Sequence, residues 1–461
     1  MSIGGKQLKK GQIIEGTIET IEFPNKGIME VDGKTIIVKN TVKGQKVEAK
    51  IIKKKGKKIE ARVTEIIERA SNEIESKCPH NEDCGGCKYL TLPYADQLAM
   101  KSEQVKSILE TGGITGFEFE EILASPKSYE YRNKMEFTFG DEFKGGPLTL
   151  GMHQMGKSFE MLTVGECQIV DQDFRTVLLT VLEYFKTKDL SFYRVMRHEG
   201  ILRHLVIRKA AQTGQILVNL VTTSQGEVPV EGMKQALLEQ EYLGEITTIL
   251  HTINDSYSDV VQSDETILLY GKDYITEKLL DLEFNISAFS FFQTNSLGAE
   301  KLYEVVREYA GNIDNKIVYD LFSGTGTIGQ IMAPIASKVY GIEIVEEAVE
   351  SAKENAKLNK LENCKFIAGD VFEKVDELKN IGEKPDIIVL DPPRSGVTPK
   401  AMSKIIDFGA ETIVYVSCKP SSLVDNLTQL IQAGYVVEKV RCVDMFPNTP
   451  HVETVCLLTR K

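Results

Sequence analysis

The chain has 461 residues, of which 26% are charged, and a net charge of −12. It contains no run of about 18 apolar residues and no apolar segment near its start, so neither a membrane span nor a secretory signal is predicted, and a cytoplasmic protein is expected. About three domains fit this length. Eight cysteines in a chain of this kind favour metal binding or catalysis over a disulfide framework.

The first 70 residues are predicted to form a small β domain. Short β-branched runs alternate with Gly-bearing turns such as PNKG and KKKGKK, a pattern typical of five strands in an OB-like barrel. This segment holds 16 Lys and Arg against 9 Asp and Glu, although the whole chain is acidic. Because a local basic surface can bind phosphates whatever the net charge is, the segment is a candidate nucleic-acid-binding domain. A lysine-rich face that is merely solvated is the alternative.

Three cysteines follow in a short stretch, spaced C-x5-C-x2-C, and a fourth stands alone farther along the chain. They are Cys78, Cys84, Cys87 and Cys167. Four thiolates suffice for a structural zinc ion or an iron–sulfur cluster, and the spacing does not distinguish the two. The spacing is longer than the C-x3-C-x2-C of radical S-adenosylmethionine enzymes, so a site of that type is not expected.

An amphipathic helix is predicted over 93–112, where apolar residues recur near helical spacing before a Gly pair. From Tyr129 to about Ile275 the pattern is mostly strand, with one helix around 171–187, which indicates an antiparallel α+β region. This region offers a second set of basic side chains for RNA: Arg132, Arg194, Arg197, Arg203 and Arg208.

Strands and helices alternate from about residue 298 onward. Continuous apolar runs such as KIVYDL, KVYGIEI, PDIIVL and ETIVYVS each precede a helical segment, and further helices are expected over 371–380 and 399–408. This rhythm predicts a parallel sheet covered on both faces, which is a doubly wound, Rossmann-like domain. The predicted fold class is therefore α/β, with an N-terminal OB-like barrel and a central α+β domain.

A glycine-rich loop at the first of these strand-to-helix turns is the candidate cofactor site. The run DLFSGTGTIG at 320–329 lets the backbone approach a nucleotide near a helix N-terminus. Glu343 ends the next strand and suits the ribose hydroxyls of either NAD or S-adenosylmethionine. Acidic residues at Asp320, Asp370 and Asp391 favour S-adenosylmethionine. Glycines needed only for helix–sheet packing are the alternative.

Cys418, in VSCKP, stands at the carboxyl end of a predicted strand, where open α/β sheets bind ligands. A lone cysteine is usually an inert buried thiol. Carbon 5 of uracil, however, becomes nucleophilic only after a thiolate adds at carbon 6, and a base must then remove the C5 proton. Glu453, in PHVETV, is the candidate base, and His451 is its rival. A carboxylate paired with a surface lysine is the structural alternative.

Taken together, these motifs resemble the RNA uracil-5-methyltransferase family. The resemblance rests on five segments: DLFSGTGTIG at 320–329, DPPR at 391–394, SCKP at 417–420, HVETV at 451–455 and SFFQTN at 290–295. It implies that Cys418 is the nucleophile, that Glu453 is the base and that S-adenosylmethionine is the methyl donor. The implied donor contacts are Gln293, Phe322, Glu343, Asp370 and Asp391.

The same resemblance divides the chain into domains. It implies a TRAM-type RNA-binding domain over 1–70, a central domain formed by 71–92 and 126–280, and a catalytic domain formed by 93–125 and 281–461. The cysteine motif is similar to that of relatives that act on ribosomal RNA and carry a [4Fe–4S] cluster. Large-subunit (23S) ribosomal RNA is therefore the expected substrate of a monomeric enzyme, with transfer RNA as the alternative.

Two other kinds of protein fit part of the pattern. An exocyclic-amine N-methyltransferase has an aromatic residue after [D/N]-P-P, where this chain has Arg394. A non-catalytic RNA-binding or redox protein on the same fold would make the presence of both Cys418 and Glu453 a coincidence. Neither accounts for the SCKP motif, so uracil methylation is the preferred interpretation.

Overall fold

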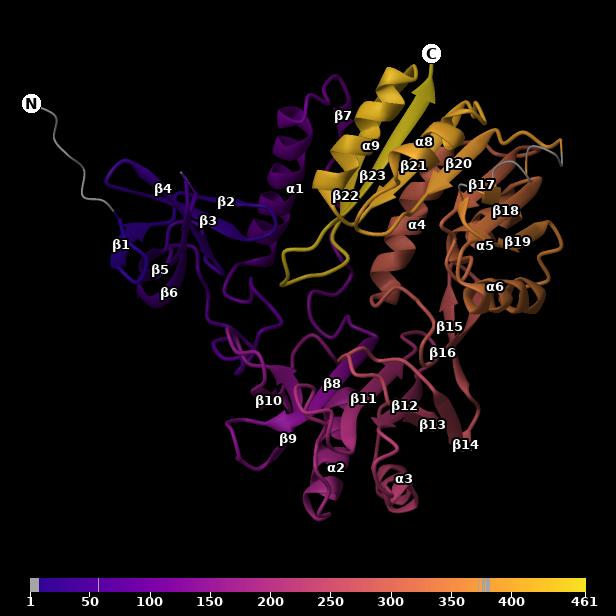
Figure 1. The fold of residues 1–461 in the computed structure, drawn as a ribbon. Coiled ribbons are helices and arrows are strands. Elements are labelled where there is room, and N and C mark those ends of the chain that lie inside the picture. Colours follow the sequence, from indigo (N-terminus) through magenta and orange to yellow (C-terminus); the bar gives the residue numbers. More distant parts are fainter. Residues whose placement is uncertain (1–7, 57, 372, 375–377, 379–381) are drawn as a thin grey trace, which may run out of the picture.

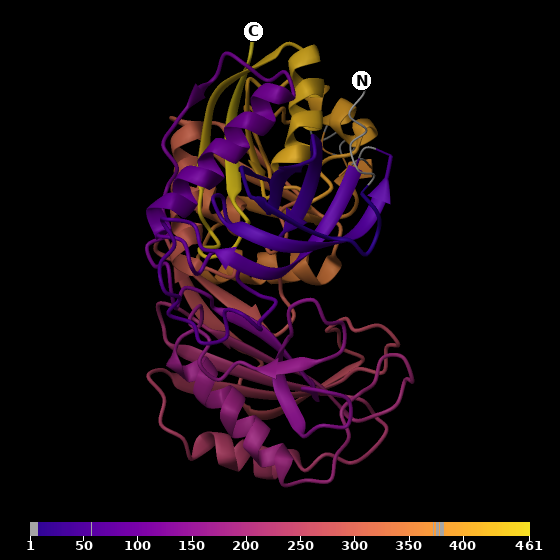
Figure 2. The ribbon, with the colours of Figure 1, turned by 90° about the vertical axis from the view of Figure 1, so that its left-hand side faces the viewer.

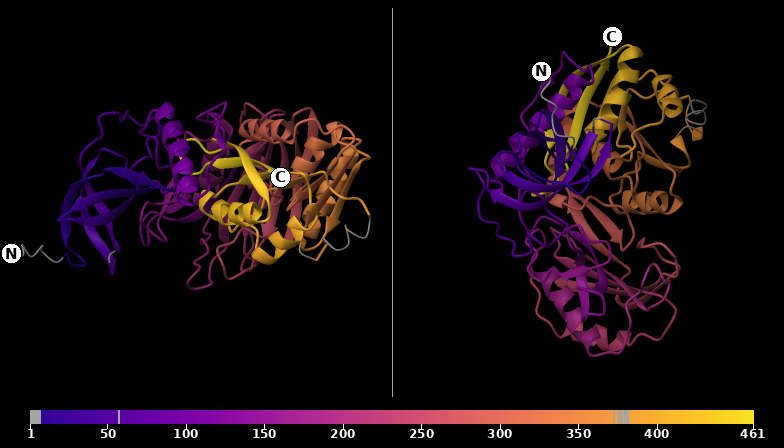
Figure 3. Two further views of the ribbon diagram at one scale, coloured as in Figure 1. Left: turned by 90° about the horizontal axis from the view of Figure 1, so that it is seen from above. Right: turned by 60° about the vertical axis from the view of Figure 1, so that its left-hand side comes forward.

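Figure 1 presents the computed structural model, which describes residues 8–56, 58–371, 373–374, 378 and 382–461. The strands of these residues form four sheets, of six, seven, two and eight strands. A small N-terminal β domain, a central domain and a C-terminal α/β domain follow one another, with α1 between the first and the last (Figures 1 and 3). The helix expected over 371–380 falls largely outside the described residues. No described helix combines the length and apolar character that crossing a membrane requires.

The N-terminal sheet has six strands, one more than expected. In sheet order they are β1 (Ile13–Thr17), β5 (Lys46–Lys55), β6 (Lys58–Glu68), β4 (Lys34–Lys39), β3 (Lys26–Val31) and β2 (Thr20–Glu22). The additional strand arises because Ile18 donates its N–H to Gln45, beside β5, and the next residue donates to Ile28 in β3. The chain therefore changes its partner strand between β1 and β2. Alternate side chains of these strands fill one apolar core.

A mixed seven-stranded sheet forms the central domain. Its order is β10 (Met161–Thr163), β9 (Leu148–His153), β8 (Lys134–Asp141), β11 (Leu202–Lys209), β12 (Gln215–Thr222), β13 (Glu245–Ile253) and β14 (Glu265–Gly271). Two helices, α2 (Gln172–Lys186) and α3 (Val230–Leu238), cover the face turned away from the C-terminal domain (Figure 1). The sequence predicted an antiparallel sheet with a single helix. This prediction is wrong for one pair of strands, because β12 and β13 are parallel. Parallel neighbours need a crossover, and α3, which is too short to stand out in the sequence, supplies it.

The C-terminal sheet has eight strands. Its order is β19 (Cys364–Ala368), β18 (Lys338–Glu343), β17 (Ile317–Leu321), β20 (Ile387–Leu390), β21 (Thr412–Ser417), β23 (Glu453–Arg460), β22 (Tyr435–Val443) and β7 (Glu118–Phe119). All strands from β19 to β21 are parallel. β23, in contrast, is antiparallel to both β21 and β22. The alternating rhythm did not predict this, because a hairpin without a helix joins the last two strands.

Helices cover both faces of the C-terminal sheet. They are α4 (Ser296–Ala310), α5 (Thr327–Met332), the short η1 (Ala333–Ile335), α6 (Glu346–Leu358), α8 (Pro399–Ile406) and α9 (Pro420–Gln432). A separate apolar core lies on each face, one built around α4 and the other around α8 and α9. The doubly wound α/β arrangement predicted from the sequence is therefore confirmed. A hairpin of β15 (Tyr274–Leu279) and β16 (Leu282–Ser287) connects this domain to the central one.

The helix α1 (Tyr94–Thr111) precedes the central domain in sequence but packs on the C-terminal domain. It lies beside α9 (Figure 2), and Val105 and Leu109 enter the core on that face. Its other side reaches the N-terminal sheet, because the Gln104 amide donates to the Ile21 carbonyl at 2.8 Å. α1 therefore connects two parts of the molecule that are far apart in sequence.

Candidate active site

The parallel strands bring the predicted site residues to one edge of the C-terminal sheet, at their carboxyl ends. Their places are Asp320 in β17, Glu343 at the end of β18, Asp391 after β20 and Cys418 after β21. The buried side chain of Tyr303, in α4, lies behind this edge. Its pKa is raised first by burial and then by three carboxyl groups: Asp391, Asp320 and Glu453. These acidic groups therefore surround a common region.

Strand register sets Cys418 beside Glu453. β21 and β23 are antiparallel, and Ser417 at the end of β21 pairs with Thr454 of β23. Continued by one residue, this register puts Cys418 opposite Glu453, the first residue of β23. The Glu453 side chain is buried, at 4% exposure, whereas Cys418 is half-buried and remains reachable. The sheet thus brings a thiol and a carboxyl group to neighbouring positions.

Burial sets the protonation of this pair. It raises the pKa of the Glu453 carboxyl to about 8, with a further rise from the Asp391 charge and an opposing effect of Arg394. Burial, followed by the charges of Glu453 and Asp391, raises the pKa of the Cys418 thiol to about 11. Burial also raises the pKa of Asp391 itself, to about 7. A cationic ligand would lower each of these pKa values, so the site is suited to a positively charged ligand.

The rival base, His451, lies two residues before Glu453 in a different setting. Its ring is half-buried and stands edge-on to the Phe446 ring, with the centroids 6.0 Å apart. Burial, followed by nearby cationic side chains of which Arg394 is the largest, lowers its pKa. His451 is therefore neutral near pH 7 and able to accept a proton, so electrostatics alone does not select the base.

The glycine-rich loop between β17 and α5 has the features of a nucleotide-type cofactor site. Phe322 has a φ of 66°, an uncommon left-handed conformation for a residue other than glycine. The Glu343 carboxylate accepts the N–H groups of Gly324 and Val345, each at 3.0 Å and one on each oxygen. Each oxygen keeps a further lone pair for a ligand hydroxyl group. Gly326 is explained without a ligand, because its φ is 71° and a Cβ atom there would lie 2.5 Å from Phe366.

Asp320 tests whether a polar ligand fits this loop. Its Oδ2 accepts the Gly329 N–H at 2.8 Å, whereas its Oδ1 is buried without a hydrogen-bond partner among the described residues. Burial raises the pKa of this carboxyl to about 7. Buried polar atoms in native proteins almost always have a partner. The ammonium and hydroxyl groups of S-adenosylmethionine are donors of the kind that this region lacks.

The two remaining predicted donor contacts lie farther from the centre of the loop. Gln293 is half-buried in the segment between β16 and α4. This segment touches the glycine-rich loop, because the Thr325 hydroxyl donates to the Phe291 carbonyl at 3.3 Å. Asp370 lies just beyond β19 and has an exposed side chain. The structure therefore joins the Gln293 segment to the loop and leaves Asp370 at the outer edge of the site.

Arg394 and Tyr303 are site residues to which the sequence analysis gave no role. The charge of Arg394 opposes the rise in pKa of both Cys418 and Glu453. The DPPR motif could have indicated this role for Arg394, because the motif directly follows β20 and also contains Asp391. Tyr303 gave no such signal, since it is one of many buried residues on an ordinary amphipathic helix.

The four cysteines of the C-x5-C-x2-C motif and its downstream partner line one cavity of about 30 Å³, together with apolar side chains such as Leu90 and Val164. Burial raises the pKa of the Cys84, Cys87 and Cys167 thiols, that of Cys167 to about 11. Among the described residues, no three His, Cys, Asp or Glu side chains are arranged to hold a metal ion. The structure therefore brings the four predicted ligands to one cavity, without a metal-holding arrangement among its described residues.

Basic side chains suited to phosphates lie on the N-terminal sheet. Its strands β5 and β6 carry exposed lysines at Lys50, Lys53, Lys55 and Lys58. In the central domain, by contrast, Arg203 and Arg208 are 1% and 2% exposed. Their guanidinium groups donate to backbone carbonyls, among them those of Asn254 and Ala288. Two of the five central arginines are therefore structural and are removed from the expected RNA-binding set.

Comparison with known proteins identifies the family. The family model described as tRNA (Uracil-5-)-methyltransferase matches residues 93–461. A relative from Clostridium tetani, named an uncharacterized RNA methyltransferase, is 53% identical over 98% of this chain and 99% of its own length. One of the same description from Staphylococcus aureus is 33% identical over 98% and 99%.

A solved structure shows that the fold is shared over nearly the whole chain. The Pyrococcus abyssi tRNA (uracil-54, C5)-methyltransferase, in complex with S-adenosyl-L-homocysteine, matches with a TM-score of 0.77 at 24% identity. The match covers 97% of this chain and 100% of that one. The protein is an RNA methyltransferase, and it belongs to the tRNA (uracil-5-)-methyltransferase family.

Proposed function

We propose that this enzyme transfers the methyl group of S-adenosylmethionine to carbon 5 of a uracil in RNA, with Cys418 as covalent nucleophile and Glu453 as base. The observation that carries the proposal is the register of β21 and β23, by which a reachable thiol and a buried carboxyl group become neighbours. Methylation of an exocyclic amine needs no covalent nucleophile and would leave Cys418 without a role.

The proposed reaction uses one sulfur atom and one base. The Cys418 thiol loses its proton to solvent, and the thiolate adds to carbon 6 while the electron pair of the C5=C6 double bond moves toward the C4 oxygen. S-Adenosylmethionine, when bound, supplies the methyl group that carbon 5 then takes. The Glu453 carboxylate removes the C5 proton, the C5–H electron pair re-forms the double bond, and the C6–S bond breaks to return the thiolate.

Positive charge near Cys418 is a requirement of this scheme, because burial and two carboxyl groups raise its pKa to about 11. Arg394 acts in the opposite direction and favours the thiolate. The sulfonium charge of the donor has the same sign as Arg394 and strengthens this effect. The donor is therefore expected to bind before the thiolate adds to the RNA.

Donor contacts are proposed for Gln293, Phe322, Glu343, Asp391 and Asp370, in addition to the buried oxygen of Asp320. Glu343 has the best-supported role, since both of its oxygens are held by backbone N–H groups and can still accept from ribose hydroxyls. Asp370 has the weakest support, because its side chain is exposed beyond β19.

The cysteine cavity is proposed to hold a [4Fe–4S] cluster on Cys78, Cys84, Cys87 and Cys167. In support, all four thiols line one cavity, and burial keeps at least three of them protonated until a metal displaces the protons. The proposed methylation includes no oxidation or reduction step, so the cluster has no part in the chemistry. Its four ligands would instead tie residues 78–87 to the central domain at Cys167.

The N-terminal sheet is proposed to act as a TRAM-type, OB-like domain whose exposed lysines hold the RNA backbone, while 71–92 with 126–280 and 93–125 with 281–461 form the central and catalytic domains. The proposed substrate is 23S ribosomal RNA, on the strength of the cysteine motif combined with this domain. Transfer RNA is the second candidate, because the matching family model carries its name and the Pyrococcus abyssi enzyme with the same fold is a tRNA methyltransferase.

Cys418→Ala tests the reaction itself. Methylation of a uridine-bearing RNA should fall by at least about 10³-fold, because no group remains to activate carbon 5. Donor affinity measured by calorimetry should stay near that of the parent, since the thiol acts on the RNA base. Cys364→Ala, at a half-buried cysteine of β19, is the matched control and should retain activity. Ordinary turnover by Cys418→Ala would remove the covalent mechanism.

The substrate is tested by mass spectrometry of RNA from a strain that lacks the gene. Loss of 5-methyluridine from 23S ribosomal RNA is expected. Loss from transfer RNA, with ribosomal RNA unchanged, would select the second candidate.

A further inference from the structure

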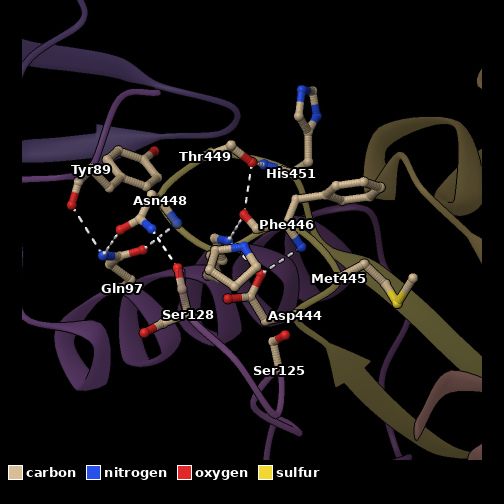
Figure 4. Close-up of polar contacts among 12 residues, drawn as sticks. Tyr89, Gln97, Ser125, Ser128, Asp444, Met445, Phe446, Asn448, Thr449 and His451 are labelled. Atoms are coloured by element: carbon tan, nitrogen blue, oxygen red, sulfur yellow. Dashed lines mark hydrogen bonds and ion pairs between the residues drawn. The ribbon is translucent and has the colours of Figure 1, made fainter. Parts of the chain in front are cut away.

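The connection between β22 and β23, residues 444–452, leads into the active site and is held by buried polar contacts. It carries His451 and ends at Glu453. Loops between strands are normally exposed and mobile, yet Asp444 and Asn448 are only 0% and 2% exposed. Figure 4 shows polar groups from α1 and from residues near 128 converging on this loop, while the His451 ring points away from them. The loop is therefore positioned by other parts of the chain.

Gln97 of α1 is the centre of these contacts. Its Oε1 accepts the Asn448 N–H at 2.8 Å, and its Nε2 donates to the Asn448 Oδ1 at 3.1 Å. The same Nε2 donates to the carbonyls of Tyr89 and Leu92, each at 3.0 Å. The side chain is 1% exposed and uses both of its polar atoms. A buried amide that is satisfied in this way fixes the orientation of its partner.

Asn448 joins three segments that are distant in sequence. Its φ of 64° is left-handed, a conformation that asparagine tolerates better than most residues. Its carbonyl accepts the N–H groups of Lys88 and Tyr89 at 2.9 and 3.1 Å, and its side-chain amide donates to the Ser128 carbonyl at 2.7 Å. Lys88 directly follows Cys87. The cysteine cavity and the catalytic loop therefore share one anchor.

Contacts on both sides of Asn448 hold the rest of the loop. The Lys101 ammonium donates to Asp444 at 2.6 Å and to the Phe446 carbonyl at 3.1 Å, and both charged side chains are fully buried. Nearer to β23, the Thr449 hydroxyl donates to the Phe446 carbonyl at 2.8 Å and accepts the His451 N–H at 3.3 Å. Contacts from α1 and contacts within the loop thus fix the turn that precedes the proposed base at the start of β23.

We infer that Gln97, Asn448 and Thr449 are positioning residues for the proposed base. They hold residues 444–452 so that the Glu453 carboxylate meets the C5 proton after Cys418 has added to the uracil. The inference rests on the proposed function and extends it to the step that releases the product. A displacement of the base by about 1 Å is enough to cost about 10²-fold in rate. Donor binding uses other elements, so these residues govern proton removal and not donor affinity.

Gln97→Ala removes the four hydrogen bonds of this side chain and should lower kcat by about 10²-fold. Because only the last proton transfer is slowed, a methylated protein–RNA adduct should accumulate and survive denaturing electrophoresis. Donor affinity measured by calorimetry should be unchanged. Val181→Ala is the control for a general loss of stability, because Val181 is a buried residue of α2. This variant should accumulate no adduct.

A milder pair of variants decides the matter if Gln97→Ala does not fold. Thr449→Val removes the hydroxyl that holds the His451 N–H but keeps the shape of the side chain, whereas Thr449→Ser keeps the hydroxyl. Adduct should accumulate with Thr449→Val, at a smaller amplitude, and not with Thr449→Ser. Equal behaviour of the two variants, or loss of activity in Gln97→Ala without adduct, would overturn the inference.

Glu453→Gln separates this inference from the proposed function. If Glu453→Gln traps adduct and the folded loop variants do not, the base is assigned correctly and the positioning role is wrong. If Glu453→Gln traps no adduct, the proposed function fails first, whatever the loop variants do.

Discussion

The cysteines fall into two groups with different surroundings: the four that line one cavity, and Cys418, which stands alone at the edge of the C-terminal sheet. Burial is the main cause of a raised thiol pKa in both groups. In the cysteine cavity the pKa of Cys87 is raised first by burial and then by other thiols: Cys167, Cys84 and Cys78. At the edge of the C-terminal sheet, the groups that add to the effect of burial on Cys418 are the carboxyl groups of Glu453 and Asp391. The neighbours, and not the burial, distinguish the two places.

In the proposed function, this difference separates the ligand site of a cluster from a reaction site. Thiols that share a cavity lose their protons together only when a cation replaces them. A single thiol next to a carboxyl group with a pKa of about 8 pairs a nucleophile with a group that can accept the C5 proton near neutral pH. Cys442 and Cys456 show a third case, since both are fully buried in the core around α8 and α9 and behave as small apolar residues.

The largest effect is expected from breaking the ligand site. Cys87→Ser should abolish cluster binding, so that protein prepared without oxygen loses its brown colour and the about four irons per chain that a [4Fe–4S] cluster contributes. Cys364→Ser, at a cysteine outside both groups, should keep the iron. Metal analysis of the parent protein that finds zinc and no iron would contradict the assignment.

The pH dependence of turnover probes the reaction site. Burial, followed by the Asp391 charge, raises the pKa of Glu453 to about 8. The base must be ionised, so release of tritium from C5, followed on adduct that has already formed with labelled RNA, should rise about tenfold per pH unit below this value and level off above it. Stability should change in the opposite direction: a carboxyl with a raised folded pKa stabilises the protein below its unfolded pKa of about 4.3, and this is lost as pH rises through about 8.

Variants of the cysteine cavity that remain folded should keep this pH profile, because the thiols of that cavity take no part in the proton transfer. This result would sharpen the comparison between the two groups of cysteines. A profile that is flat between pH 6 and 9 in the parent enzyme would show that Glu453 is not the titrating base.

The smallest effect is expected from the N-terminal lysines, which belong to neither cysteine group. Replacing Lys50, Lys53 and Lys55 with Ala should weaken RNA binding and flatten the slope of log affinity against log salt by up to about 2, at ~0.7 per phosphate contact. These side chains are exposed on β5. Substitution is a cleaner test than deletion of the domain, because deletion would also remove a contact with the rest of the protein. In this contact the Tyr89 hydroxyl donates to the Pro24 carbonyl at 2.9 Å. An unchanged slope would mean that the lysines only solvate a surface.

Much of the C-terminal domain could be predicted because its signals are local. Apolar runs before helices predicted the parallel strands, and the carboxyl ends of these strands are where the sequence analysis placed Cys418, Asp391 and Glu343. The antiparallel β22–β23 pair could not be predicted, because a buried strand has the same apolar pattern whichever way it runs. The short helix α3, and with it the parallel pairing of β12 and β13, was missed for lack of a strong periodic signal.

The site was predicted as separate residues but not as an arrangement. Motifs indicated Cys418 and Glu453 individually, whereas their adjacency follows from a strand register that no local pattern reveals. The contact of Gln97 with Asn448 spans 351 positions in the sequence. Likewise, the burial of Arg203 by backbone carbonyls cannot be read from its charge, which suggested an RNA contact.

The central claim, a covalent Cys418 adduct resolved by Glu453, is tested most directly by mass spectrometry of Glu453→Gln after incubation with donor and RNA. The expected result is a denaturation-resistant protein–RNA species in which the peptide containing Cys418 carries a methylated uridine. Cys418→Ala combined with Glu453→Gln should give none. Turnover of Glu453→Gln at the parent rate, or an adduct trapped by His451→Ala in its place, would contradict the account.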